Sequence, residues 1–237
     1  MTQILDSVQT RRTLMRSALV MASGAVVSAC ATRTLNLAAA PAPIVPVPQP
    51  SPIPAAPQVV KSTRTAPGNI RPELFKRAIA ALDRHSVRIA SHDRIAIADF
   101  ATPSHRPRFH IVSLGSGEVQ SYLVAHGIGS DPEHTGLLHS FSNAVNSEAT
   151  SEGAFLTSDY YVGKHGDSQR LLGLDPTNNN AFDRAIVVHS AWYSNADMIA
   201  KHGKLGRSQG CFAVGERELA KVFERLGPGR MIYSAKV

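Results

Sequence analysis

The chain has 237 residues, of which 43% are hydrophobic and 18% charged, so it can bury the core of one domain with additional segments or of two small domains. The net charge is +7, but residues 1–67 carry six Lys/Arg and one Asp, whereas residues 68–237 carry 19 Lys/Arg and 17 Asp/Glu. Because the later residues are nearly neutral and show no basic stripe, we expect no nucleic-acid partner.

The N-terminal residues 1–29 predict an export signal. Three arginines within residues 11–16 precede a short apolar run at 17–27, and this run is shorter than the roughly 20 residues that cross a bilayer. The stretch "TRRTLM" resembles a twin-arginine signal. The stretch "VSAC" resembles the lipobox of bacterial lipoproteins, which implies lipidation of Cys30. An ordinary signal peptide with an incidental cysteine is the alternative.

Residues 30–67 form a predicted linker that is rich in proline and alanine and cannot build a core. Proline favours an extended chain of about 3.1 Å per residue, so some 30 residues reach roughly 90 Å. The residue after Cys30 is Ala31, whereas an aspartate there favours inner-membrane retention in Gram-negative lipoproteins. We therefore expect an exported protein whose lipid anchor lies in the outer membrane and whose domain faces the periplasm.

The remaining residues, 68–237, predict a single folded domain. Helical spacing of apolar residues and β-rich runs alternate along it. We expect helices within 70–85, 195–203 and 215–227, two strands within 108–127 around a Gly-Ser-Gly turn, and further strands within 94–100, 154–163, 184–192 and 229–237. This order predicts a mainly β fold with short helices, in the α+β class, arranged as a sandwich or barrel.

The stretch "LGRSQGCFAV" contains Cys211, one of two cysteines in the chain. Composition alone leaves a nucleophile and an inert core cysteine equally open. A nucleophile needs a base, and His189 lies near the end of a predicted strand, where it would be held rigidly. Gly210 allows the backbone to bend so that N–H groups face a substrate carbonyl.

The other histidines do not predict a metal site. His126, His134 and His139 lie in a loop-rich region without tight ligand spacing, so we expect them to be surface or hydrogen-bonded residues. His165 and His202 each precede a glycine and are expected in turns.

The stretch "VVHSAWYSNADMIAKHGKLGRSQGCFAV" resembles the catalytic signature of the L,D-transpeptidases with the YkuD-type fold. That signature has His followed by Gly or Ser, a spacer, and then Ser/Thr-His-Gly-Cys. The resemblance extends through "VAHGIGSD", "FSNAVNSEATSEGAF" and "YVGKHGDSQRLLGLD", from about Phe109 to the C-terminus, and these motifs are similar to the murein L,D-transpeptidase catalytic domain branch.

The resemblance implies a role for each matching residue. Cys211 would be the nucleophile, His189 the general base, and Ser190 the third member through its backbone carbonyl. The residues implied at the oxyanion and substrate sites are Trp192, Tyr193, Arg207, Ser208, Gln209 and Gly210.

Three features depart from the signature. Gln209 replaces the second histidine, so His189 would be the only titratable base supplied by the signature. The spacer before Cys211 is longer than usual, and no arginine follows it at Val214. Arg207 or Arg217 would then bind a substrate carboxylate.

The implied substrate is a peptidoglycan stem peptide, cleaved before its terminal D-residue through an acyl-enzyme, without a metal or organic cofactor. The acyl acceptor would be another stem, a protein tethered to the cell wall, or water in an L,D-carboxypeptidase. Two other functions stay open. One is a sortase-like cysteine transpeptidase, although the expected tetrapeptide and arginine are not evident. The other is a non-catalytic peptidoglycan-binding lipoprotein in which Cys211 is inert.

Overall fold

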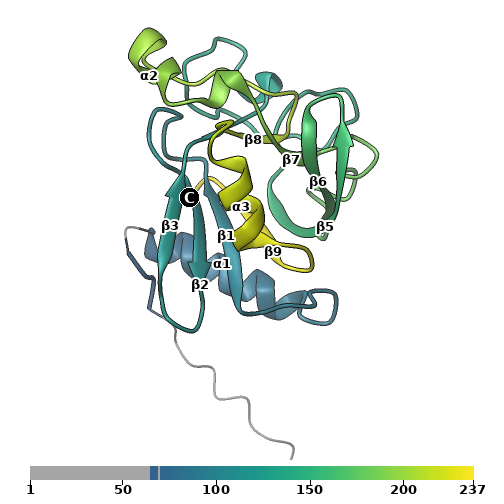
Figure 1. The fold of residues 1–237 in the computed structure, drawn as a ribbon. Coiled ribbons are helices and arrows are strands. Elements are labelled where there is room, and N and C mark those ends of the chain that lie inside the picture. The colour runs from purple at the N-terminus through teal and green to yellow at the C-terminus, as the bar shows by residue number, and fades with distance from the viewer. Residues whose placement is uncertain (1–64, 69) are drawn as a thin grey trace, which may run out of the picture. The chain divides into compact units, whose positions relative to one another are not determined.

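The computed structural model describes residues 65–68 and 70–237 (Figure 1). The predicted export signal, Cys30 and most of the predicted linker lie outside the described residues, so the boundaries of the three predicted segments stay predictions. No helix of the described part is long and apolar enough to span a bilayer.

Nine strands and three α-helices make up the described part of the chain. The strands are β1 (Arg94–Asp99), β2 (Phe109–Ser113), β3 (Val119–Tyr122), β4 (Val124–Ala125), β5 (Gly153–Gly163), β6 (Gly166–Gly173), β7 (Val187–Ser190), β8 (Phe212–Val214) and β9 (Met231–Ala235). The helices are α1 (Pro72–Arg84), α2 (Asp197–His202) and α3 (Leu219–Leu226), with short 3-10 turns η1 (Ile128–Ser130) and η2 (Trp192–Ser194).

The strands form one mixed sheet in the order β3-β2-β1-β9-β5-β6-β7-β8-β4. Neighbours pair antiparallel except β1 with β9 and β7 with β8, which pair parallel. The prediction of a mainly β fold with short helices is confirmed.

The longest helices, α1 and α3, cover opposite faces of the sheet (Figure 1). Successive side chains of a strand point to opposite faces, so Ile95 and Ile97 of β1 pack in the cluster with α1, whereas Ala96 and Ala98 pack in the cluster with α3. Both faces of β1 are therefore buried, which explains its nearly continuous apolar sequence.

The predicted helices and strands are confirmed where local sequence signals are strong. Pro72 stands in the first turn of α1, and Gly203 ends α2 with a φ of 71°, as expected for a glycine C-cap. The second of the two strands predicted within 108–127 is divided into β3 and β4, and the strands β6 and β8 were not predicted. β4 and β8 have two and three residues, too few for a periodic pattern, and they exist through pairing with each other and with β7.

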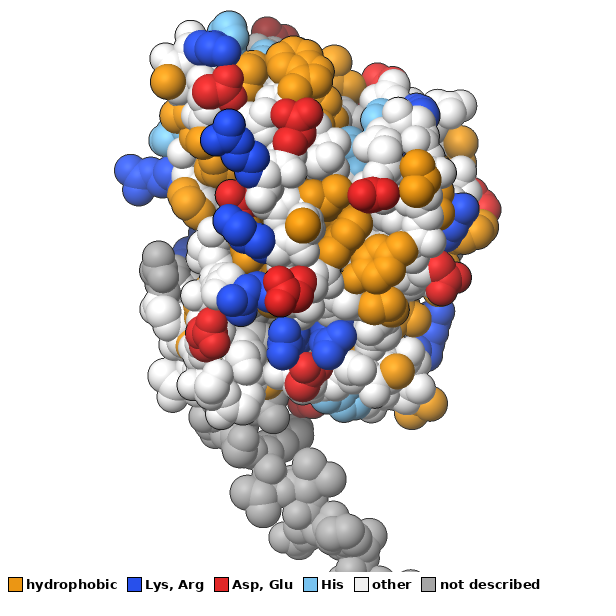
Figure 2. All heavy atoms as spheres, viewed as in Figure 1, with side chains coloured by type: hydrophobic (Ala, Val, Ile, Leu, Met, Phe, Trp, Pro, Cys, Tyr) orange, Lys and Arg blue, Asp and Glu red, His pale blue; other side chains and the backbone are white. Residues whose placement is uncertain are grey.

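Acidic and basic side chains intermix on the face that Figure 2 shows, with small groups of hydrophobic side chains between them. Tyr160 of β5 packs on Phe223 of α3, and their ring centroids lie 4.8 Å apart. Tyr160 also donates a hydrogen bond to the Phe223 carbonyl at 3.0 Å. This contact ties α3 to the sheet at the rim of the domain.

Candidate active site

His189 and Cys211 lie on two neighbouring parallel strands. His189 in β7 is paired with Ala213 in β8, and Cys211 immediately precedes β8. Cys211 thus lies two residues before the strand partner of His189, so the pairing of β7 with β8 brings the two residues to neighbouring parts of the sheet.

The His189 imidazole is held in one tautomer. Its Nδ1 lies 2.8 Å from the Ser190 carbonyl oxygen, and because a carbonyl only accepts, Nδ1 carries the proton and Nε2 has a free lone pair. The side chain is 1% exposed. Burial is the main cause that lowers the pKa of His189 below its usual value, so the ring is neutral at neutral pH and Nε2 can accept a proton.

The Cys211 thiol is free and buried. Its Sγ donates to the Ala185 carbonyl oxygen at 3.6 Å. Burial raises the pKa of Cys211 above its usual value, and the positive charges of Lys164 and Arg184 offset only part of that rise. The Cys211 thiol and the His189 imidazole are therefore both neutral at neutral pH.

Gly210 is required by the turn before Cys211. Its φ is +108°, and a Cβ there would lie 2.7 Å from the Ala149 carbonyl oxygen and 2.8 Å from Ile186 Cδ1. The Ser208 hydroxyl closes the turn: it accepts from the Gly210 N–H at 3.2 Å and donates to the Cys211 carbonyl at 2.7 Å. A substrate oxygen at the implied oxyanion site would compete with this hydroxyl for the Gly210 N–H.

Gln209 is exposed and faces a neighbouring loop. Its Nε2 donates to Glu148 Oε1 at 2.7 Å. Glu148 and Asn146 have φ values of 52° and 63°, which are uncommon for residues other than glycine. The amide therefore secures the loop at 146–148 against the turn that carries Cys211.

Arg184 was not anticipated as a residue of the site. Its Nη1 donates to the Ser142 carbonyl at 2.8 Å and to Ser151 Oγ at 2.6 Å, and its Nη2 donates to the Ala149 carbonyl. The guanidinium thus gathers the 142–151 loop beside Gly210 and places a positive charge near Cys211. In the sequence this arginine lies five residues before His189 without a motif that distinguishes it.

Trp192 and Tyr193 differ in how they border the site. Trp192 is 66% exposed, and its ring meets that of Tyr193 edge to face at 5.8 Å. Tyr193 packs against Ala191 and Ala213, close to Cys211. Burial, followed by the charge of Cys211, raises the pKa of Tyr193 to about 12. Tyr193 is therefore a neutral wall beside the thiol, and Trp192 lies on the outer surface.

Arg207 secures the loop that leads to Cys211. Its Nη1 donates to the carbonyl oxygens of Asp131 and Pro132, the latter at 2.9 Å. The Nη1 of Arg207, which was considered for a substrate carboxylate, is thus hydrogen-bonded to two main-chain carbonyls. Arg217, the other arginine considered for a substrate carboxylate, lines a separate cavity described below.

A buried polar network underlies the same loop. Arg108 is 0% exposed, and its Nη2 donates to His126 Nδ1 at 2.7 Å, while His126 Nε2 lies 3.3 Å from Asp131 Oδ2. Burial, followed by the charge of Arg108, lowers the pKa of His126 to about 3, so this ring is neutral. The His126 carbonyl accepts the Ser208 N–H at 2.9 Å, which connects the network to the site.

The histidines considered for a metal are hydrogen-bonded in the described residues. His134 Nε2 lies 2.9 Å from the Leu205 carbonyl, and His139 Nε2 lies 2.9 Å from Thr135 Oγ1. Within residues 65–68 and 70–237, no group of three or more His, Cys, Asp or Glu side chains is arranged to hold a metal ion.

His165 is a residue of the site that sequence reasoning interpreted only as part of a turn. It does lie in the turn between β5 and β6, but its ring also stacks on that of His189, with centroids 4.4 Å apart and planes inclined by 19°. The signal for it was the stretch "YVGKHGDSQRLLGLD", which contains this histidine.

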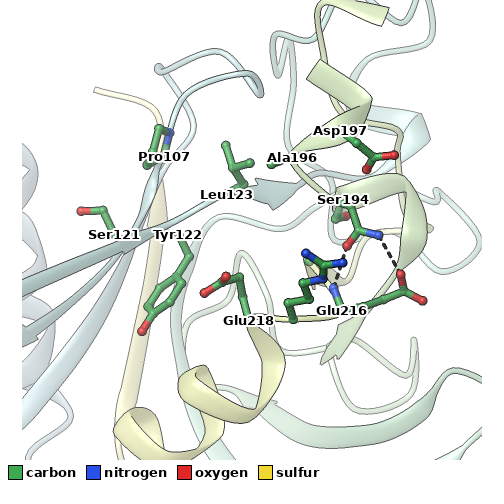
Figure 3. Close-up of a pocket in the computed structure, with 12 residues that line it drawn as sticks. Pro107, Ser121, Tyr122, Leu123, Ser194, Ala196, Asp197, Glu216 and Glu218 are labelled. Carbon is green, nitrogen blue, oxygen red and sulfur yellow. Dashed lines mark hydrogen bonds between the residues drawn. The ribbon is translucent and has the colours of Figure 1, made fainter. Parts of the chain in front are cut away.

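A separate cavity has a volume of about 790 Å³, and Figure 3 shows the residues that line it. Its walls come from β3, from the residues before α2 and from those before α3, and neither Cys211 nor His189 lines it. Asn195 and Glu216 stand on one wall, joined by hydrogen bonds of 2.7 and 2.8 Å.

Comparison with family models identifies one family for this chain. Residues 67–234 match the family described as L,D-transpeptidase catalytic domain, and no curated protein matches. Solved L,D-transpeptidases from Mycobacterium smegmatis, Mycobacterium tuberculosis and Stackebrandtia nassauensis match with 16%, 13% and 14% identity and TM-scores of 0.37, 0.39 and 0.37. The matches cover 60%, 61% and 62% of this chain and 58%, 58% and 57% of those chains, which is less than two thirds of their length. The expected YkuD-like fold is confirmed.

Proposed function

The chain belongs to the L,D-transpeptidase catalytic domain family, and we propose that its folded domain transfers peptidoglycan stem peptides through a cysteine acyl-enzyme. One observation carries the proposal. His189 donates from Nδ1 to the Ser190 carbonyl at 2.8 Å, which leaves Nε2 free to accept a proton, and its strand partner Ala213 lies two residues after Cys211. Acyl transfer through a cysteine requires a nucleophile and a general base that takes its proton.

In the acylation step, His189 Nε2 takes the proton of the Cys211 thiol as Sγ attacks the carbonyl carbon before the terminal D-residue. The negative charge on the tetrahedral oxygen is received by backbone N–H groups of Gly210 and Cys211. The C–N bond then breaks, the His189 imidazolium gives its proton to the leaving amine, and a thioester remains on Cys211.

In the second step, an acceptor amine attacks the thioester carbonyl and His189 takes its proton. The C–S bond breaks and the thiolate recovers that proton from His189, so the enzyme returns to its resting state. An amine on a second stem gives a cross-link, an amine on a protein tethers that protein to the wall, and water gives carboxypeptidase activity.

The burial and the raised pKa of Cys211 also suit a second candidate, a non-catalytic peptidoglycan-binding domain with an inert thiol. A carbapenem discriminates between the two. We expect its mass to be added to the wild-type protein, the Cys211→Ala variant to stay unmodified, and the His189→Gln variant to react far more slowly because a positioned base contributes about 10²–10⁴-fold. A folded wild-type protein that stays unmodified contradicts the enzymatic proposal.

Purified stem peptides identify the acceptor. Mass spectrometry of the products distinguishes a peptide dimer, a peptide joined to an added protein and a shortened stem. Any of the three supports acyl transfer, whereas bound but unchanged stems support the non-catalytic candidate.

We further propose that the protein is exported and anchored by lipid on Cys30, in the outer membrane and facing the periplasm. The support is the lipobox-like stretch before Cys30. Labelled fatty acid should enter the wild-type protein and not the Cys30→Ser variant, and equal recovery of both proteins in the membrane fraction would count against the anchor.

A further inference from the structure

The β5–β6 hairpin brings a second imidazole to the site. Its strands pair up to Gly163 and Gly166, so the connecting turn consists of Lys164 and His165. β6 then pairs with β7, and Ser168 is the partner of His189. The register of two adjacent strand pairs therefore brings His165 to His189.

The two rings form a close stack, with centroids 4.4 Å apart and planes inclined by 19°. His165 itself is exposed, whereas His189 is 1% exposed. His165 therefore lies between solvent and one face of the His189 ring, while the Ser190 carbonyl holds the ring edge. Together these contacts limit both rotation of the ring and access of water.

We propose that His165 is a positioning residue that covers the His189 imidazole and keeps it oriented and shielded for proton transfer from Cys211. The proposal rests on the proposed acyl transfer. It also bears on Gln209, which stands where the signature has a second histidine. The Gln209 side chain donates to Glu148, and the second imidazole near His189 comes from the β5–β6 hairpin instead.

The cover keeps His189 neutral until the thiol proton arrives. Burial is the main cause that lowers the pKa of His189, and the positive charges of His165 and Lys164, both in the turn between β5 and β6, lower it further. Burial and Lys164 also lower the pKa of His165, so at neutral pH its ring is neutral and acts on His189 mainly as a cover.

Three variants test the role. His165→Ala removes the stack, His165→Phe keeps an aromatic cover that cannot titrate, and His202→Ala is the matched control at an exposed histidine in α2. The first measurement is an NMR titration of the His189 ring nitrogens, assigned with His189→Gln. We expect the pKa of His189 to rise toward its ordinary value of about 6.5 in His165→Ala and to stay near that of the wild type in the other two variants.

The second measurement is the rate of carbapenem acylation at pH 7. We expect a loss of about two- to tenfold in His165→Ala, because a less firmly oriented His189 forfeits part of the roughly 10²–10⁴-fold that a positioned base contributes, with most of the rate kept in His165→Phe. An unchanged pKa of His189 in His165→Ala overturns the proposal, and so does a loss in His165→Phe as large as in His165→Ala. If even the wild type is not acylated, the proposed function fails, while the NMR titration still decides whether His165 covers His189.

Discussion

Replacing Arg108 with methionine tests the buried network beneath the active-site loop. Arg108 donates to the Val124 carbonyl from Nε at 3.0 Å and from Nη2 at 2.9 Å, to the Thr102 carbonyl at 2.9 Å, and to His126 Nδ1 at 2.7 Å. Methionine refills the space but leaves three acceptors without this donor. At about 1–2 kcal/mol for each, the free energy of unfolding falls by about 3–6 kcal/mol.

Such a loss is a large part of a typical domain stability of about 5–15 kcal/mol. Urea unfolding followed by far-UV circular dichroism measures it, because the only tryptophan, Trp192, is 66% exposed and reports poorly on the core. The matched control is Arg106→Met at an exposed arginine two residues away, where we expect a change within about 0.5 kcal/mol.

An Arg108→Met protein as stable as the wild type would refute this reasoning. It would mean that desolvation of the guanidinium costs as much as its hydrogen bonds return, as occurs for some buried ion pairs. The carbapenem reaction of the same variant is informative, because the His126 carbonyl accepts the Ser208 N–H of the active-site loop.

Two further predictions concern the turn before Cys211 and the buried histidines. Gly210→Ala should slow carbapenem acylation and lower Tm, because the added Cβ would lie 2.7 Å from the Ala149 carbonyl oxygen. The control Gly203→Ala also has a positive φ but meets no atom within 4 Å, so it should cost only about 1 kcal/mol of strain and leave acylation intact. Equal acylation rates and Tm values in the two variants would contradict this explanation. Burial lowers the pKa of His126 to about 3, so below about pH 6.5 this histidine binds a proton in the unfolded protein but not in the folded one. Its contribution to the free energy of unfolding is therefore fully present above pH 6.5 and falls toward pH 5 by about 1.4 kcal/mol per pH unit, which urea unfolding at several pH values measures. A flat curve between pH 7 and pH 5 would exclude a buried neutral histidine.

The sequence by itself determined the helices and strands with strong local signals. The apolar face of α1, the two strands around Gly115–Gly117 and the glycine end of α2 follow from periodicity and turn chemistry, which act between near neighbours in the chain. The choice of Cys211 and His189 rests instead on the resemblance of their stretches to the signature of a family, and their roles stay a prediction.

Only the tertiary structure decided how these residues meet. The parallel pairing of β7 with β8 brings the strand that holds His189 next to the strand that follows Cys211. The β5–β6 hairpin places His165 against His189, and the Gln209 amide donates a hydrogen bond to Glu148. These contacts join residues 22 to 61 positions apart, so they depend on sheet register and loop closure, which no local propensity specifies.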